Sequence, residues 1–574
     1  MLLAIECGVA LVLAVLALTF PRLGSSWFAS VEARFVALAH RKKLALLTVA
    51  LLALAARAAV LPILPEPQPY VNDEFSYLLA ADTFAHGRLT NPPHPLWIHF
   101  ESLNEIQQPT YASIYPPGEG LVLALGQVST GHPFVGVWLS VGLLCAALCW
   151  MLQGWFSPSW ALLGGVLAVL HFAVFSYWAN SYWGGAVAAT GGALVMGALP
   201  RLKGRQRVRD ALLMGLGAVI LANSRPYEGL VFCLPVAVAL GVWTWRGPRP
   251  PLRVVAVRVL APLGLVLSLG ALCTCYYFWR VTGNPFRMPY QVAGDTYAVT
   301  PHFIWQSRRP EPAYHHRVLR DFYTHNWLAL YQQARTPLGM LAGAAMKFGS
   351  WWMFYLGPLL TLPLAITIAT LPLGFKWRSI SWEARFLLVT SGTFFCGLAL
   401  EVYFSPHYAA PLTSVVFLLL VLVLRHLRQW RWQGQPAGGF LIRGVLGGCV
   451  FLLALRAAAG PLHLPITPDW PPTWLNGTNH LTDRARILAQ LEAHPGKQLV
   501  IVRYAPHSQP LPETLSDWVH NRADIDQAKV VWALDMGAAG NQELVDYYED
   551  RQVWRVEPDA SPPRLTPYPE KASP

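Results

Sequence analysis

Long apolar runs separated by short basic connections constrain the fold of this chain more than any other feature. Several of these runs approach the roughly 20 residues that a helix needs to cross a bilayer. Of the 574 residues, 54% are hydrophobic and only 13% are charged, a balance that excludes an ordinary soluble protein. The pattern predicts a polytopic α-helical membrane protein.

The positive charge of the chain is explained by its orientation in a lipid bilayer. A net charge of +12 would indicate a nucleic-acid partner in a soluble protein, but here Lys and Arg lie mainly in loops between apolar runs. We therefore expect the bilayer as a partner and no nucleic acid. The eight cysteines all fall in apolar segments, so the sequence predicts neither a disulfide framework nor a zinc site.

The basic connections also set the direction of each span. The run 2–20 has no basic leader region and no small-residue cleavage site, so we interpret it as a retained span. Basic residues between positions 34 and 43 place the next connection in the cytoplasm, and the run 44–64 then crosses outward. Continued in this way, the pattern predicts about twelve spans with both termini outside, and a short interfacial or re-entrant helix at 118–131. The other predicted spans are 133–152, 160–177, 183–199, 211–223, 230–245, 259–279, 352–375, 386–403, 412–424 and 441–459.

This pattern divides the chain into three parts. Residues 1–43 hold the first span and a cytoplasmic connection, and residues 44–460 form the transmembrane domain, with outer loops at 65–118 and 280–347. Residues 461–574 are Pro-rich and charged and hold no span, and their alternating segments predict a small extracytoplasmic α/β domain that serves as a lid or docking module. The predicted helices of this domain are 483–493 and 542–549, and its predicted strands are 498–504, 528–534 and 552–556.

Two adjacent carboxylates, Asp73 and Glu74, follow the second predicted span directly. Asn72 is a favourable helix N-cap and Gly87 a favourable residue just beyond a helix end, so a short helix is expected between them. First-turn acids can simply complement the helix dipole. An acidic pair beside a membrane is also typical of a functional site, and both interpretations remain open at this point.

Several polar and aromatic-rich segments fall on the same outer side as this acidic pair, whereas the opposite connections are short and basic. Such a one-sided concentration predicts an active or binding site at the outer interface. Arg57, within the second span, adds a charge that is costly there unless it reaches the interface or meets an anion. The other candidate residues from these segments are Tyr115, Tyr182, Arg225, Glu228, His407 and Tyr408.

The acidic pair after an early span, the helix before Gly87, and the Tyr-Pro-Pro segment at 115–117 before a short apolar helix together resemble the membrane-embedded GT-C glycosyltransferases. The closer similarity is to the branch of protein O-mannosyltransferases, lipid A aminoarabinose transferases and Rgt-like proteins. It covers about residues 44–459 and the C-terminal domain. The sequence FSYLLAADTF after the acidic pair and the additional N-terminal span depart from that group, which leaves the sugar and the acceptor open.

The resemblance implies an inverting transfer of a sugar from a polyprenyl-phosphate carrier to an acceptor outside the cytoplasm. Asp73 matches the position of the catalytic acid of the group, and would take the proton of the acceptor hydroxyl. Glu74 would be its catalytic partner or bind the acceptor. Pyrophosphate is not required, so a divalent metal is possible but not obligatory; no metal ligand and no other cofactor is predicted.

The remaining candidates would bind the substrate. Arg57, Arg225 and His407 would stabilise the negative charge on the departing lipid phosphate. Tyr115 and Tyr182 offer flat apolar faces to a sugar ring or prenyl chain. Glu228 and Tyr408 belong to the same outer segments and are included with them.

Each of the charged candidates has a structural alternative. Arg225 could anchor a helix end among lipid headgroups, His407 could be held only by hydrogen bonds, and Arg57 could form an ion pair with Glu74 or another acid.

Two other functions compete with glycosyl transfer, which we expect at the plasma (inner) membrane of the cell. A transporter or flippase for lipid-linked or anionic small molecules predicts internal repeats and broken helices with charges near the membrane centre. We find no convincing repeat, and most charges lie at the edges of the runs. A non-catalytic scaffold would instead use the outer domain to bind partners. The sugar, the carrier length and the acceptor, whether protein, lipid or polysaccharide, stay open.

Overall fold

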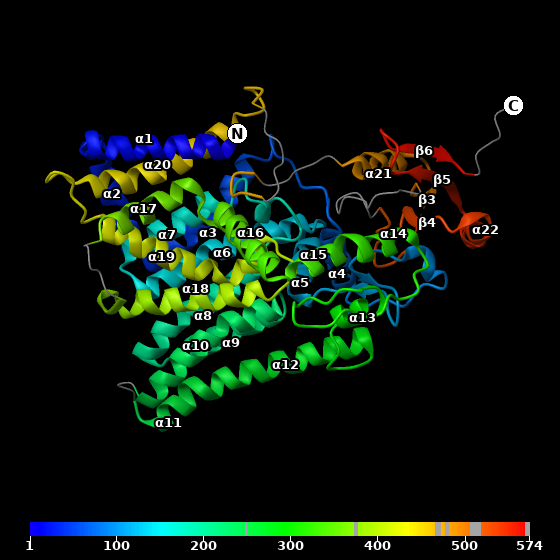
Figure 1. Cartoon of the computed structure of the whole chain (residues 1–574), viewed down its shortest axis with the longest axis horizontal. Helices are drawn as coiled ribbons and strands as arrows, with labels where there is room; N and C mark the ends of the chain where they lie inside the picture. Colours follow the sequence, from blue (N-terminus) through cyan, green and yellow to red (C-terminus); the bar gives the residue numbers. More distant parts are fainter. Residues whose placement is uncertain (247–249, 372–376, 465–471, 477–481, 506–517, 569–574) are drawn as a thin grey trace.

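The computed structural model describes residues 1–246, 250–371, 377–464, 472–476, 482–505 and 518–568. Figure 1 shows its long helices running side by side as a bundle, with a small sheet beyond one end. The helices of the bundle are α1 (Leu2–Thr19), α2 (Ser25–His40), α3 (Lys42–Ala59), α6 (Phe134–Trp155), α7 (Pro158–Phe172), α8 (Ala186–Arg205), α9 (Val208–Ala222), α10 (Pro226–Arg246), α11 (Leu252–Val255), α12 (Ala261–Thr282), α16 (Pro337–Tyr355), α17 (Gly357–Ala369), α18 (Trp382–Ala399), α19 (Thr413–Leu427) and α20 (Ala437–Ala457).

A membrane protein is the fold class that these helices support. Within the described residues, six helices are long and apolar enough to cross a bilayer, and α16 with α17, bent by 99° at their junction, makes a seventh candidate. The helix α3 coincides with a predicted span but carries Lys42, Lys43 and Arg57 within its 18 residues. The total of about twelve spans therefore stays a prediction from the run lengths. The predicted connection after the first span contains a further helix, α2.

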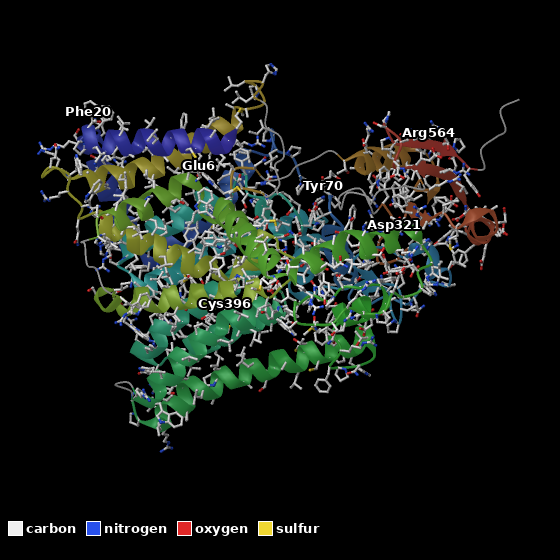
Figure 2. All side chains as sticks on the ribbon, viewed as in Figure 1. Glu6, Phe20, Tyr70, Asp321, Cys396 and Arg564 are labelled. Atoms are coloured by element: carbon white, nitrogen blue, oxygen red, sulfur yellow. The ribbon has the colours of Figure 1, made fainter. Side chains whose placement is uncertain are left out.

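The polar segments that the sequence assigns to the outer side gather at one end of the bundle, which we call the loop end (Figure 1). Figure 2 places Tyr70 and Asp321 there, on the side of the bundle where Arg564 of the sheet domain lies. The basic connections between α8 and α9 and between α19 and α20 lie at the opposite end. The short elements of the loop end are α4 (Asn72–Ala85), η1 (Trp97–Phe100), α5 (Pro117–Thr130), η2 (Tyr177–Ala179), α13 (Pro289–Thr296), α14 (Arg317–Asp321), η4 (Phe322–Asn326), α15 (Trp327–Ala334) and η6 (Pro406–Leu412).

The helix α4 carries the acidic pair and begins one residue earlier than its predicted cap implies. Asn72 is its first helical residue, and Val71 precedes it. Glu74 accepts hydrogen bonds from the backbone N–H groups of Tyr70 and Val71, so a carboxylate satisfies donors that the first turn leaves unpaired. Gly87 has a φ of 71°, which confirms the predicted left-handed residue after the helix.

The helix α5 packs beside α4 and is joined to α6 by a tight turn. A side chain at Gly126 of α5 or at Gly136 of α6 would collide with the backbone of the other helix. The two helices therefore approach closely, which fixes the segment in front of α5 against the bundle. That segment holds the short hairpin of β1 (Glu105–Ile106) and β2 (Ala112–Ser113), in which Glu105 pairs with Ser113.

The C-terminal part forms the predicted small α/β domain. Its sheet has the order β4-β3-β5-β6, with β4 (Val530–Leu534), β3 (Lys497–Val502) and β5 (Arg551–Glu557) parallel and β6 (Arg564–Pro567) antiparallel. The helices α21 (Asp483–Ala493) and α22 (Gly537–Tyr547) accompany it. The strand β6 was not predicted from the sequence, because four residues that end in a proline are too few to mark a strand.

Candidate active site

The Asp73 carboxylate points from the first turn of α4 toward the β1–β2 hairpin. Its Oδ1 atom accepts hydrogen bonds of 2.5 Å from the hydroxyl of Tyr115 and from the amide of Asn104. Within the described residues no hydrogen bond reaches Oδ2, and the side chain is half-buried. Burial raises the pKa of Asp73, and Tyr115, Arg225 and Asn104 offset part of that rise. Such a carboxyl group is suited to take up a proton.

Aromatic rings surround this carboxylate on the side of α5. Tyr115 stacks on Tyr77 of α4 with 4.2 Å between ring centroids, and meets Tyr290 of α13 edge to face at 5.4 Å. Tyr77 and Tyr115 are buried, whereas Tyr290 is half-buried. The rings restrict the water around Asp73 and leave an apolar surface on which a sugar ring can stack.

Arg225 is a positively charged residue whose charge lowers the pKa of Asp73. It immediately precedes α10. Its guanidinium lies 4.3 Å from the ring centre of Tyr408 and 3.6 Å from the Oε1 atom of Glu228. Only 11% of the Arg225 side chain and 7% of the Glu228 side chain are exposed. The same charge opposes the effect of burial at Glu119 of α5, where burial raises the pKa to about 8. Arg225 thus stands among several carboxylates in a water-poor position, where its charge acts strongly.

His407 lies deeper than the outer surface predicted for it. It belongs to η6, is 1% exposed, and shares a hydrogen bond of 3.1 Å between its Nδ1 atom and the hydroxyl of Tyr177. Its ring meets Trp183 edge to face at 4.8 Å. The Nε2 atom has no hydrogen-bond partner in the described part of the chain. A buried polar atom without a partner is unusual, and it leaves His407 able to bind a ligand atom.

Glu74 and Tyr182 serve as anchors in this structure. The two oxygens of Glu74 accept hydrogen bonds from the backbone N–H groups of Tyr70, Val71 and Tyr182, at 2.7, 3.2 and 2.9 Å. Burial raises the pKa of Glu74 to about 7, although these three donors favour the ionised form. The carboxylate therefore ties the start of α4 to the segment before α8, and its oxygens are already occupied.

The structure does not bring Arg57 to Asp73. Its guanidinium donates to the carbonyl oxygens of Leu64 at 2.9 Å, Pro65 at 3.2 Å and Ala179 at 3.4 Å, and only 1% of the residue is exposed. Three backbone acceptors satisfy the charge that made Arg57 conspicuous in the sequence. The residue joins the end of α3 to the loop that follows it.

Several residues near the site escaped the sequence analysis. Glu401, just after α18, is buried and has an Oε1 atom without a partner among the described residues, and Lys347 donates to the backbone carbonyls of Leu398 and Glu401. A charge at the end of an apolar run was the available signal for both. Asn104 and Tyr290 gave no such signal, because each lies in a long polar loop. Within the described residues no three His, Cys, Asp or Glu side chains are grouped as a metal ion requires.

No protein-family model and no curated protein sequence matches the chain. A solved structure of ArnT from Cupriavidus metallidurans, in the apo state, has a TM-score of 0.49 and 14% identity, over 88% of this chain and 92% of that one. A structure of ArnT bound to undecaprenyl phosphate gives 0.40 and 12%, over 89% and 92%. The oligosaccharyltransferase of Archaeoglobus fulgidus, in the apo form, gives 0.44 and 10%, over 80% of this chain and 62% of that one.

This chain therefore spans about 62% of the length of that oligosaccharyltransferase. All three TM-scores are below 0.5, so we infer the function from the residues of the site itself. The ArnT and oligosaccharyltransferase structures named here are of the GT-C type.

Proposed function

We propose that the protein is a membrane glycosyltransferase that moves a sugar from a polyprenyl-phosphate carrier to an acceptor on the outer face of the plasma membrane. The observation that carries the proposal is the surroundings of Asp73. One oxygen of this carboxyl group is held by two donors, the other accepts no hydrogen bond in the described residues, and a buried arginine stands nearby. A base and an anion-stabilising group are the two groups that transfer from a lipid phosphate requires.

In this proposal Asp73 acts as the base and Arg225 stabilises the leaving group. The acceptor hydroxyl gives its proton to Oδ2 of Asp73 as its oxygen forms a bond to the anomeric carbon. The bond between that carbon and the phosphate oxygen breaks, and the lipid phosphate leaves with the electron pair. A single displacement of this kind inverts the anomeric centre. Arg225 stabilises the negative charge that grows on the leaving phosphate.

Neighbouring residues orient the two principal groups. Tyr115 fixes the carboxylate of Asp73, while Glu228 and the ring of Tyr408 hold the guanidinium of Arg225. The Nε2 atom of His407, which has no partner among the described residues, adds a second position for a polar group of the donor. In this proposal Glu74, Tyr182 and Arg57 maintain the frame of the site without contacting the substrate.

A mostly apolar cavity that Lys347 helps to line offers a place for one unit of the isoprenoid chain. Its volume is about 100 Å³, and it lies between α16 and the end of α18. Apart from one lysine its lining is apolar, as a prenyl unit requires. The lining residues are Ala344, Lys347, Phe348, Phe395, Leu398 and Ala399.

The test uses the full-length protein purified into lipid nanodiscs. Incubated with lipid-linked sugars extracted from the membranes of its own host, the protein should release free polyprenyl phosphate, detected by mass spectrometry. Deletion of the gene should remove a sugar from the glycans or glycoproteins of the cell envelope. Unchanged envelope glycans together with no release from any extract would overturn the proposal.

A lipid flippase is the second candidate, because α16 and α17 meet at a 99° bend and the buried Lys347 lies in α16. Broken helices with charged groups are typical of transporters. Movement of a fluorescent polyprenyl phosphate between the leaflets of proteoliposomes, without cleavage of any sugar, would favour this function over transfer.

A further inference from the structure

The two hydrogen-bond donors that hold Asp73 come from one small element, the β1–β2 hairpin. Asn104 stands immediately before β1, and Tyr115 follows β2 by two residues. Both donate to Oδ1 of Asp73 at 2.5 Å. The position of the hairpin therefore decides how the carboxylate is oriented and which of its oxygens stays open.

The hairpin is fastened to α4 by hydrogen bonds of Ser76. Its hydroxyl donates to the carbonyl of Asn104 at 2.5 Å and lies 2.7 Å from the hydroxyl of Ser113. Asn104 has a φ of 61°, in the left-handed region, which asparagine adopts more readily than most other residues that carry a side chain.

The outward side of the hairpin is held by the C-terminal domain through His520. The Nδ1 atom of His520 lies 2.9 Å from Oε1 of Glu105, and these side chains are 2% and 1% exposed. Ser102 donates to the other carboxylate oxygen of Glu105 at 2.6 Å. Burial raises the pKa of Glu105 to about 8, so this carboxyl group depends strongly on its partners.

The ring of His520 also contacts α4 itself. It stacks on Phe75 with 4.2 Å between centroids and an interplanar angle of 4°. Phe75 is two residues from Asp73. One side chain from a domain more than 400 residues further along the chain thus touches both elements whose relative position defines the proposed base.

The hydroxyl of Tyr111, just before β2, also donates to the carbonyl of Asn521 in the domain, and two further contacts bypass the hairpin. Asp526 lies 3.1 Å from Nε2 of His94, and the backbone N–H of Ala523 donates to Asp82 at 2.9 Å. These contacts dock the domain on the 65–118 loop and on the later turns of α4. They provide matched controls, because they share the docking role of His520 without its connection to Asn104 and Tyr115.

We propose that His520 is a positioning residue for the transfer reaction. Through Glu105 it sets the β1–β2 hairpin against α4, so that Asn104 and Tyr115 hold Oδ1 of Asp73 and leave Oδ2 to the acceptor. The C-terminal domain is then part of the apparatus that orients the base. The inference rests on the proposed function, because it takes Asp73 to be the proton acceptor.

The test compares full-length variants in nanodiscs. His520→Ala should lower turnover of the extracted lipid-linked sugars about tenfold, because small misplacements of a catalytic group are costly. Its KM for the donor should stay within twofold, since Arg225 and His407 are untouched. His520→Asn should restore most of the rate, because its amide nitrogen occupies nearly the place of Nδ1. Asp526→Asn, the docking control, should retain wild-type turnover.

A second measurement does not depend on turnover. The rate at which a water-soluble carbodiimide and an amine modify Asp73, read from the mass of its peptide, reports how firmly the carboxyl group is held. His520→Ala should raise this rate severalfold, while Asp526→Asn leaves it unchanged. Thermal unfolding of each variant shows whether the domain remains folded and docked.

The outcomes separate the inference from the proposed function. Equal turnover and equal labelling in His520→Ala and Asp526→Asn would overturn the positioning role, whatever Asp73 does. A fully active Asp73→Asn variant would overturn the proposed function, and the labelling of Asp73 would still decide whether His520 positions it.

Discussion

Two clusters of buried charged residues lie at the loop end of the bundle. They differ in whether backbone groups or side chains form their hydrogen bonds and ion pairs. In the first, Arg57 and Glu74 are paired almost entirely with backbone groups, and every nitrogen and oxygen of their charged groups has a partner. In the second, Asp73 and Arg225 meet other side chains, and one oxygen of Asp73 stays open within the described residues.

The comparison shows how a structural charge differs from one available for chemistry. A buried charge needs compensating partners, and backbone carbonyls and N–H groups supply them permanently. A cluster built from side chains can leave polar atoms unpaired, as at His407 Nε2 and Glu401 Oε1 within the described parts of the chain. Such atoms are costly unless a ligand completes them. We therefore infer that the first cluster maintains the fold, and we propose the second as the place where the substrate binds.

The largest effect is expected for Asp73→Asn, which removes the proton acceptor but preserves its shape. Turnover should fall by roughly 10²- to 10⁴-fold, the usual contribution of a general base. Release of polyprenyl phosphate measures it, and binding of undecaprenyl phosphate should be nearly unchanged. Turnover within threefold of the wild type would remove Asp73 from the mechanism.

Arg225→Gln should follow, with a loss of about 10²- to 10³-fold, because the departing phosphate loses a charge that stabilises it in a water-poor site. Unlike Asp73→Asn, this variant should also bind undecaprenyl phosphate more weakly, as measured by thermal shift. Arg225→Lys should recover part of the rate, since it keeps the charge and loses the planar donor geometry. Unimpaired binding and turnover in Arg225→Gln would place the phosphate elsewhere.

Arg57→Met should affect stability and leave the chemistry intact. It deprives three carbonyl oxygens of their partner, and we expect a loss on the order of 3 kcal/mol. The melting temperature in nanodiscs should fall, while turnover per folded molecule stays within twofold. A large loss of turnover at unchanged stability would instead indicate that Arg57 contacts the substrate.

Glu74→Gln should have the smallest effect, visible mainly as a change with pH. Burial raises the pKa of Glu74 from 4.5 to about 7, so the wild type loses stability as the pH rises through that interval. Glutamine at this position cannot ionise. The melting temperature of the variant, relative to that of the wild type, should therefore rise between pH 5 and pH 7. A difference in melting temperature that does not vary with pH would show that Glu74 is ionised throughout.

Much of the architecture follows from local sequence patterns. The apolar runs gave the helical membrane class, Gly87 marked the end of α4, and alternating segments predicted the C-terminal α/β domain. Asp73, Arg225, Glu228 and Tyr408 were selected as candidates for one site, and the structure shows Arg225 in contact with the last two and close enough to act on Asp73. Such properties depend on composition and on neighbouring residues, which a sequence displays directly.

Only the tertiary structure decided which buried charges pair with backbone and which with side chains. The local pattern did not distinguish Asp73 from Glu74, and only the resemblance to GT-C glycosyltransferases favoured the first. Nothing in the sequence indicated that Asn104 and His520 would help to orient Asp73. These roles depend on which carbonyls, amides and rings the packed helices bring within a few ångströms of each charge. Segments that are hundreds of residues apart supply these groups, so local sequence patterns cannot predict which of them will meet.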